Sequence, residues 1–190
     1  MSLKGETTKL KILQTAQTLF TTKGYANVTM NDICIACNIS RGGLYRHFGS
    51  TSEIFTGILK EEQRQAHESL EKAIQNKVSP DKLLKNFIRS RALKVTDTEK
   101  CIDNCITDFA SESPENKQLL IERAETAITI IAQILELGVS SNDFHCEKPR
   151  DTAIHILTCL EGISKHNTLI PFSPAELELQ LQLIEKSYIK

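Results

Sequence analysis

The sequence predicts an all-α fold of about nine helices, with a three-helix domain at residues 1–49 and a helical bundle at residues 50–190. Apolar residues recur at three- and four-residue spacings along most of the chain, as they do on the buried face of a helix. Helix-start signals precede these runs, three of them as Ser-Pro pairs, because serine caps a helix and proline is tolerated in its first turn. No run has the composition that strands favour.

The N-terminal domain opens with one long helix. Its apolar stripe includes Leu13 and Phe20, and it is expected to run from about Thr7 to Lys23. Gly24 follows and is the expected stop.

Residues 29–48 predict two short helices joined by a tight turn. Thr29 is a good N-cap, and Asp32 three residues later completes a capping-box pair. Asn38 tolerates the left-handed conformation that a sharp turn between helices requires. Ser40 then caps the second helix. The pattern is that of a helix-turn-helix.

The second helix of this pair has a polar, glycine-containing outer face. Leu44 and Phe48 are expected to point inward. The expected outward residues are Arg41, Gly42, Gly43, Tyr45, Arg46 and His47. Arginines can reach a guanine edge or a phosphate, and residues without side chains allow close approach to a groove. This helix is therefore predicted to lie against a polyanion.

The charge of the chain is unevenly distributed. The net charge is −1, but residues 1–52 hold six basic side chains against two acidic ones. The remaining residues hold 17 basic and 22 acidic side chains. A basic head on an acidic body is expected of a DNA-binding domain joined to a body that does not bind DNA.

The rest of the chain reads as further helices. Ser50 and Glu53 form a second predicted capping box, which starts a long helix that ends near Gln75. Gly138 is expected to end a later helix. The other expected helices lie at about 80–92, 101–112, 115–137, 149–166 and 174–188.

The N-terminal third resembles the TetR family of bacterial transcriptional regulators. The resemblance lies in residues 12–25 (ILxxAxxLFxxKGY), 29–33 (TMNDI) and 37–55 (CNISRGGLYRHFGSTSEIF). It implies a homodimer that pairs through its last two helices, binds a double-stranded DNA operator and responds to a small-molecule effector. The expected function is thus a ligand-responsive regulator, most simply a repressor released from a palindromic operator by its effector.

The resemblance also assigns DNA-contacting positions. They are Thr29, Ser40, Arg41, Gly42, Tyr45, His47 and Thr51. Two positions depart from the family pattern. Asn38 replaces a frequent glycine, and Thr51 replaces a usual phosphate-binding lysine. Since a hydroxyl donates only one neutral hydrogen bond, Thr51 is expected to bind the DNA phosphate backbone more weakly than that lysine would.

An effector pocket is expected in the body. The candidate lining residues are Phe87, Cys105, Ile106, Phe109, Ile128, Ile131 and Cys159. Ordinary core packing is the competing interpretation for each of these residues taken singly.

The cysteines suggest further alternatives. Cys34 and Cys37 form a C-x-x-C, but without a βαβ pattern or a second such pair they are expected to be buried packing residues. Cys101 and Cys105 leave open a thiol-, electrophile- or metal-sensing repressor of the same fold. His155 and Cys159 could be half of a metal site, but no third or fourth ligand is evident. No metal or cofactor is predicted.

Two other classes of protein are not favoured. An enzyme would need a nucleophile–base pair or a metal constellation, and neither is apparent. The polar N-terminus lacks a secretory h-region, and the longest apolar stretch is too short to span a bilayer. A cytoplasmic protein with no membrane partner is expected, and its cysteines are expected to be free thiols.

Overall fold

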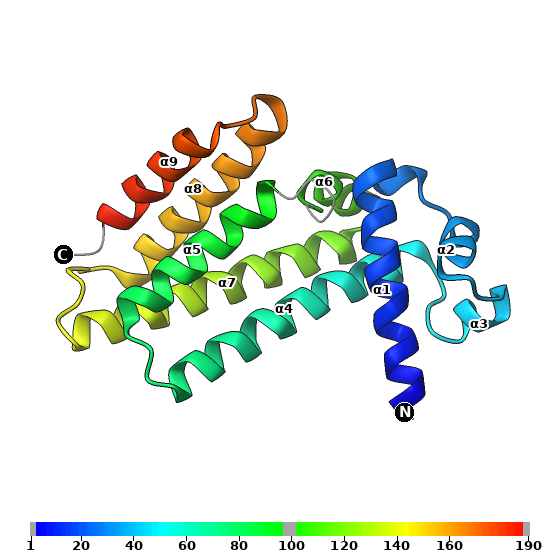
Figure 1. Cartoon of the computed structure of the whole chain (residues 1–190), viewed down its shortest axis with the longest axis horizontal. Helices are drawn as coiled ribbons and strands as arrows, with labels where there is room; N and C mark the ends of the chain where they lie inside the picture. Colours follow the sequence, from blue (N-terminus) through cyan, green and yellow to red (C-terminus); the bar gives the residue numbers. More distant parts are fainter. Residues whose placement is uncertain (1–2, 97–101, 188–190) are drawn as a thin grey trace. The chain divides into compact units, whose positions relative to one another are not determined.

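The computed structural model describes residues 3–96 and 102–187, with side chains for residues 5–92 and 102–187. These residues form an all-α fold with nine α-helices and one short 3₁₀ helix (Figure 1), which confirms the predicted fold class. The elements are α1 (Leu3–Lys23), η1 (Tyr25–Asn27), α2 (Met30–Cys37), α3 (Arg41–Tyr45), α4 (Thr51–Gln75), α5 (Pro80–Thr96), α6 (Asp103–Glu112), α7 (Pro114–Ser140), α8 (Pro149–Leu169) and α9 (Pro174–Lys186).

The chain divides into two compact units. Unit 1 comprises Met1–Ala66 and Thr98–Gln118, and unit 2 comprises His67–Asp97 and Leu119–Lys190. Helices α4 and α7 each contribute residues to both units. Unit 1 is thus larger than the expected domain 1–49, and the functional boundary at residue 49 stays a prediction.

An aromatic cluster forms part of the core of unit 1. Phe20 of α1, Tyr25 of η1, Phe55 of α4 and Phe109 of α6 pack with ring centroids 4.7–5.6 Å apart. All four side chains are buried. Such stacked, edge-on and tilted arrangements add to the stability that burial of the rings already provides. The cluster joins α6 to the helices of the N-terminal segment.

The core of unit 2 consists mainly of aliphatic side chains from α5, α7, α8 and α9, together with Phe144. Leu84, Ile88, Ile131, Leu135 and Ile156 are fully buried in it. The helices of this unit were predicted from the spacing of these apolar residues. Burial of their apolar surface supplies the main favourable contribution to the stability of the bundle.

Gly138 does not end its helix, so that expectation was wrong. Helix α7 continues to Ser140, and a Cβ atom at Gly138 would lie only 2.0 Å from Cδ2 of Phe144. The chain turns back at Asn142, whose φ of 63° is left-handed, and the Phe144 amide donates to the Gly138 carbonyl at 3.0 Å. The glycine is needed because the ring of Phe144 packs directly on the helix backbone.

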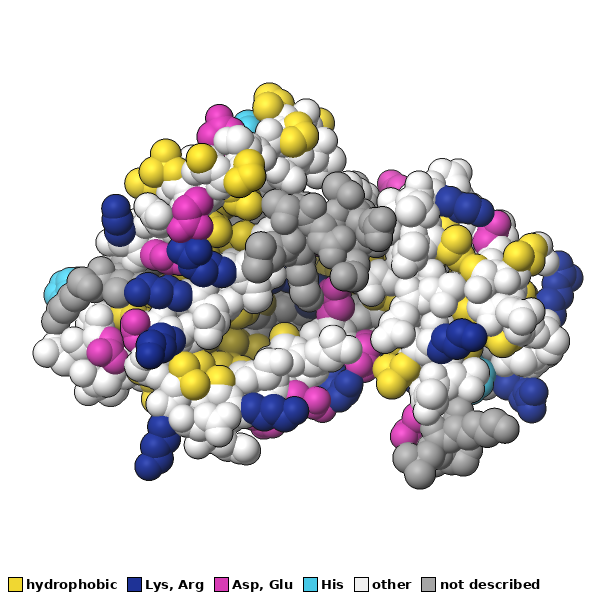
Figure 2. All heavy atoms as spheres, in the orientation of Figure 1, with side chains coloured by type: hydrophobic (Ala, Val, Ile, Leu, Met, Phe, Trp, Pro, Cys, Tyr) yellow, Lys and Arg dark blue, Asp and Glu magenta, His cyan; other side chains and the backbone are white. Residues whose placement is uncertain are grey.

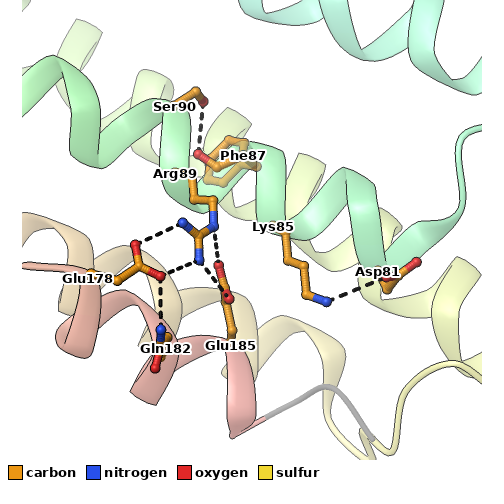
Figure 3. A network of polar contacts seen from close by, with 8 residues as sticks. All are labelled: Asp81, Lys85, Phe87, Arg89, Ser90, Glu178, Gln182 and Glu185. Carbon is orange, nitrogen blue, oxygen red and sulfur yellow. Dashed lines mark hydrogen bonds and ion pairs between the residues drawn. The ribbon is translucent and has the colours of Figure 1, made fainter.

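A polar network connects α5 to α9 within unit 2 (Figure 3). The Arg89 guanidinium donates to both carboxylate oxygens of Glu178 at 2.9 Å and to Glu185 at 2.9 Å. These bonds lower the pKa of Glu178, with the hydrogen bond from Arg89 as the main cause. Planar arginine–carboxylate pairing of this kind fixes geometry as well as charge.

No helix in the described ranges is both long enough and apolar enough to cross a membrane.

Candidate nucleic-acid interface

The first helix of the predicted helix-turn-helix is capped as expected. The Thr29 hydroxyl accepts from the Asp32 amide at 3.2 Å, and the Asp32 carboxylate accepts from the Thr29 amide at 2.9 Å. Lys23 donates to the same carboxylate at 2.7 Å. The Lys23 hydrogen bond, followed by those from Thr29, holds the pKa of Asp32 well below its usual range. The start of α2 is therefore fixed to the end of α1.

The turn between α2 and α3 also forms as predicted. Asn38 adopts the left-handed conformation, with φ 53° and ψ 51°. The amide of Ile39 donates to the Cys34 carbonyl at 3.1 Å. Ser40 then caps α3, because its hydroxyl accepts from the Gly43 amide at 3.1 Å. Asparagine thus supplies the left-handed position without glycine.

Helix α3 presents its polar side chains to solvent. Tyr45 is 54% exposed, and Arg41 and Arg46 are also exposed. Leu44 is fully buried and Phe48 nearly so, as predicted. The helix is short, since it ends at Tyr45 and Arg46 is its C-cap. Figure 2 shows Lys and Arg side chains in dark blue around the α2–α3 part of unit 1.

The two glycines of α3 differ. A Cβ atom at Gly42 would meet nothing within 4 Å, whereas one at Gly43 would lie 3.2 Å from the Ser40 hydroxyl oxygen. The absence of a side chain at Gly43 therefore leaves room for the Ser40 hydroxyl that caps the helix. The absence of one at Gly42 leaves open space that another molecule can approach. The two arginines make long contacts, Arg41 to the Asn31 side chain at 3.3 Å and Arg46 to the Gly42 carbonyl at 3.4 Å.

The His47 side chain is less exposed to solvent than expected. The residue is half-buried, and its Nδ1 atom is buried without a hydrogen-bond partner among the described residues. The physical reason is that His47 follows the end of α3, where the chain turns and buries the next residue, Phe48. His47 therefore has a packing role in addition to any contact with DNA.

Thr51 is half-buried at the first position of α4. One half of the expected capping box is present, since the Ser50 hydroxyl accepts from the Glu53 amide at 3.0 Å. The other half differs, because the Glu53 carboxylate accepts from the Gly49 amide at 2.6 Å. A helix N-terminus attracts anions, but here a carboxylate already occupies that end.

The expected pocket residues are distributed over the two compact units. Cys105, Ile106 and Phe109 belong to unit 1, where Phe109 lies in the aromatic cluster. The Cys105 thiol is buried and donates to the Phe20 carbonyl at 3.3 Å. Cys101 lies outside the described residues. Cys34 and Cys37 are free thiols and both are buried, as packing residues would be.

The other four candidates belong to unit 2. Ile128 and Ile131 are buried in its core, and Phe87 is half-buried against that core. Cys159 instead lines a hollow of about 380 Å³ between α8 and α9. Sequence periodicity could not locate this hollow, since its walls come from two helices whose facing residues are set by tertiary packing.

Exposed apolar side chains lie on α8, α9 and the segment between them, and Figure 2 shows hydrophobic side chains in yellow over this part of unit 2. They are Ile154, Leu169, Ile170, Leu179 and Leu183, of which Leu169 is 74% exposed. One of them, Leu183, lines the hollow. Grouped exposed hydrophobic residues mark surfaces that contact another molecule.

Comparison with known proteins agrees with this geometry. Residues 12–58 match the family described as bacterial regulatory proteins, tetR family. YfiR of Bacillus subtilis, an uncharacterized HTH-type transcriptional regulator, is 27% identical over 157 residues, which is 80% of this chain and 76% of YfiR.

Two solved structures share the fold. A TetR-family regulator from Agrobacterium tumefaciens has a TM-score of 0.81 at 16% identity, over 98% of this chain and 100% of that one. AibR, solved with isovaleryl coenzyme A and operator DNA, has a TM-score of 0.68 at 19% identity, over 95% of this chain and 97% of AibR.

Proposed function

Since this chain belongs to the TetR family of bacterial transcriptional regulators, we propose that it is a repressor that binds a palindromic operator as a homodimer and is released by a small effector. The family consists of DNA-binding regulators and not of enzymes. The observation that carries the proposal is the exposed surface of α3, which has two arginines, a tyrosine and an open glycine on a helix fixed by caps.

The proposed contacts divide by chemistry. Arg41 and Arg46 reach guanine edges or phosphates, Tyr45 donates to a phosphate, and Gly42 allows close approach of the helix to the groove. Thr29, Ser40, Gly43, His47 and Thr51 complete the proposed DNA surface. The hydroxyls of Thr29 and Ser40 already accept from amides of their own helices, but a hydroxyl can still donate its proton to a phosphate.

The proposed dimer forms through α8 and α9. Their exposed apolar side chains would be covered by the same surface of a second copy in a two-fold symmetric interface. Arg89 helps to fix the position of α9 in this surface, because its ion pairs hold α9 against α5 (Figure 3). Two α3 helices would then reach successive major grooves of one operator.

The proposed effector acts through the helices that the two units share. AibR has been solved with isovaleryl coenzyme A and with operator DNA, which supports a small organic effector in this fold. A molecule that binds unit 2 can alter α4, whose first residues pack in unit 1. Such a molecule releases DNA only if it binds the conformation that does not bind DNA more tightly than the conformation that does.

The thiol-sensing alternative through Cys105 is not favoured. A buried thiol that already donates a hydrogen bond is poorly placed to react with an electrophile, and Cys105 is both buried and bonded to the Phe20 carbonyl.

Selection of duplexes from a randomised pool tests the proposal. The expected result is an inverted repeat whose half-sites are centred about 34–36 Å apart, or a modest multiple of that distance. Tyr45→Ala is expected to weaken binding to the selected duplex about tenfold with an unchanged circular dichroism spectrum, since it removes one hydrogen bond to a phosphate in each half-site. Enrichment of no sequence, or of a single half-site bound by monomers, would contradict the proposal.

A further inference from the structure

His155 and Cys159 bring two metal-binding atoms together on the surface of α8. They lie four residues apart, so both side chains are on one face of the helix. The distance from His155 Nε2 to Cys159 Sγ is 3.6 Å. Both residues line the hollow between α8 and α9, and Cys159 is a free thiol.

That distance matches one edge of a zinc coordination tetrahedron. Zinc binds thiolate sulfur at about 2.3 Å and imidazole nitrogen at about 2.0–2.1 Å. With a tetrahedral angle between them, the nitrogen and the sulfur lie about 3.6 Å apart. The side chains thus already have the separation that a bound zinc ion would impose.

The described residues of one protomer supply two ligands of such a site. Among its described residues there is no group of three or more His, Cys, Asp or Glu side chains that could hold a metal ion. Structural zinc sites use four protein ligands. The described residues of one chain therefore leave two ligand positions for a second molecule to supply.

A second copy of the same chain can supply that pair. Cys159 is the middle residue of α8, ten residues from Pro149 and ten from Leu169. If the two-fold axis of the proposed dimer crosses the middle of α8, this part of the helix faces its own counterpart. Gly162 lies beside Cys159 on the hollow, and a Cβ atom there would meet nothing within 4 Å, so a neighbouring helix can approach closely.

We propose that the homodimer binds one zinc ion on its two-fold axis through His155 and Cys159 of both copies. The inference rests on the proposed dimer through α8 and α9. Binding converts each thiol to a thiolate and releases its proton to solvent, while each imidazole binds in its neutral form. Because the ion contacts only the assembled dimer, it stabilises the dimer over the monomer by mass action.

Titration of the full chain with Co²⁺ in the presence of a non-metal-binding reductant tests this proposal, since cobalt bound to thiolates is visible by absorption. The expected stoichiometry is half a cobalt ion per chain, displaced by Zn²⁺. His155→Ala and Cys159→Ser should each abolish this binding. The matched controls are His166→Asn, which alters another histidine of the same hollow, and Cys146→Ser, which alters another cysteine of unit 2; both should bind normally.

Measurement of mass in solution with EDTA separates this proposal from the proposed function. A chain that is dimeric and binds its operator in EDTA, yet takes up no cobalt or retains uptake after Cys159→Ser, would overturn the metal site alone. Uptake of one ion per chain by a monomer would overturn it as well. A monomer that binds neither cobalt nor DNA would overturn both proposals.

Discussion

Arg89 and Glu185 form an ion pair between α5 and α9, with 2.9 Å between Arg89 Nε and a carboxylate oxygen of Glu185. The Glu185 side chain is only 10% exposed, so its charge depends on this partner. Removal of one member of a buried pair leaves an uncompensated charge, which costs more than the intact pair contributes.

Arg89→Met is therefore expected to lower the free energy of unfolding by about 1–3 kcal/mol. The control is Arg150→Met, which removes an exposed pair with Glu125 and should cost less than about 1 kcal/mol. Urea unfolding at one fixed protein concentration measures both variants. Equal losses would show that the Arg89 network does not hold α9 in place.

Gly138→Ala is expected to destabilise the protein by about 1–3 kcal/mol, because the new methyl group would overlap the Phe144 ring. Gly42→Ala has open space at its Cβ position and should change stability by less than about 0.5 kcal/mol. Thermal unfolding followed by circular dichroism distinguishes the two variants. A neutral Gly138→Ala would mean that the segment around Phe144 can move away at no cost.

Tyr25 should ionise at a higher pH than an ordinary tyrosine. Burial, followed by the hydrogen bond with Glu112, raises the pKa of Tyr25 from 10.0 to about 12. The neutral phenol is thus favoured in the folded state, and the stability that this difference contributes is present below pH 10 and lost as pH rises from 10 through 12. Absorbance titration of tyrosinate should show one of the three tyrosines ionising near pH 12, and Tyr25→Phe should remove that step. An unchanged titration curve in the variant would contradict the assignment.

Thiol labelling should discriminate among the cysteines. Cys105 is buried and should react with iodoacetamide only when unit 1 opens, whereas the half-buried Cys146 should react readily. Mass spectrometry after brief labelling of the native protein measures the order. Fast modification of Cys105 would return the thiol-sensing alternative to consideration.

Features set by neighbours in the sequence were predictable from it. The cap at Thr29, the left-handed turn at Asn38 and the cap at Ser40 each depend on residues within four positions, and all three formed as expected. Local propensity and the fold agree there.

Features set by distant residues were not predictable in the same way. Gly138 had the sequence signature of a helix stop, but its role is decided by Phe144 packing on the helix. Phe109 was expected to line a pocket, and its side chain is buried against the rings of Tyr25 and Phe55 from two other elements. The pairing of Glu53 with Gly49 rather than Ser50 depends on the path of the chain before α4. Periodicity shows that a side chain faces inward and does not show what it meets there.

The central claim is that α3 is the DNA-contacting surface. The most direct test is the salt dependence of operator binding for the double variant Arg41→Ala, Arg46→Ala. The control is Arg150→Ala, which removes an exposed arginine of unit 2 outside the proposed DNA surface. Each lost phosphate contact lowers the slope of log K against log salt by about 0.9. The double variant should therefore bind more weakly, with a slope reduced by about 2 to 4 per dimer, while Arg150→Ala behaves as the wild type. An unchanged slope and affinity in a folded double variant would contradict the account.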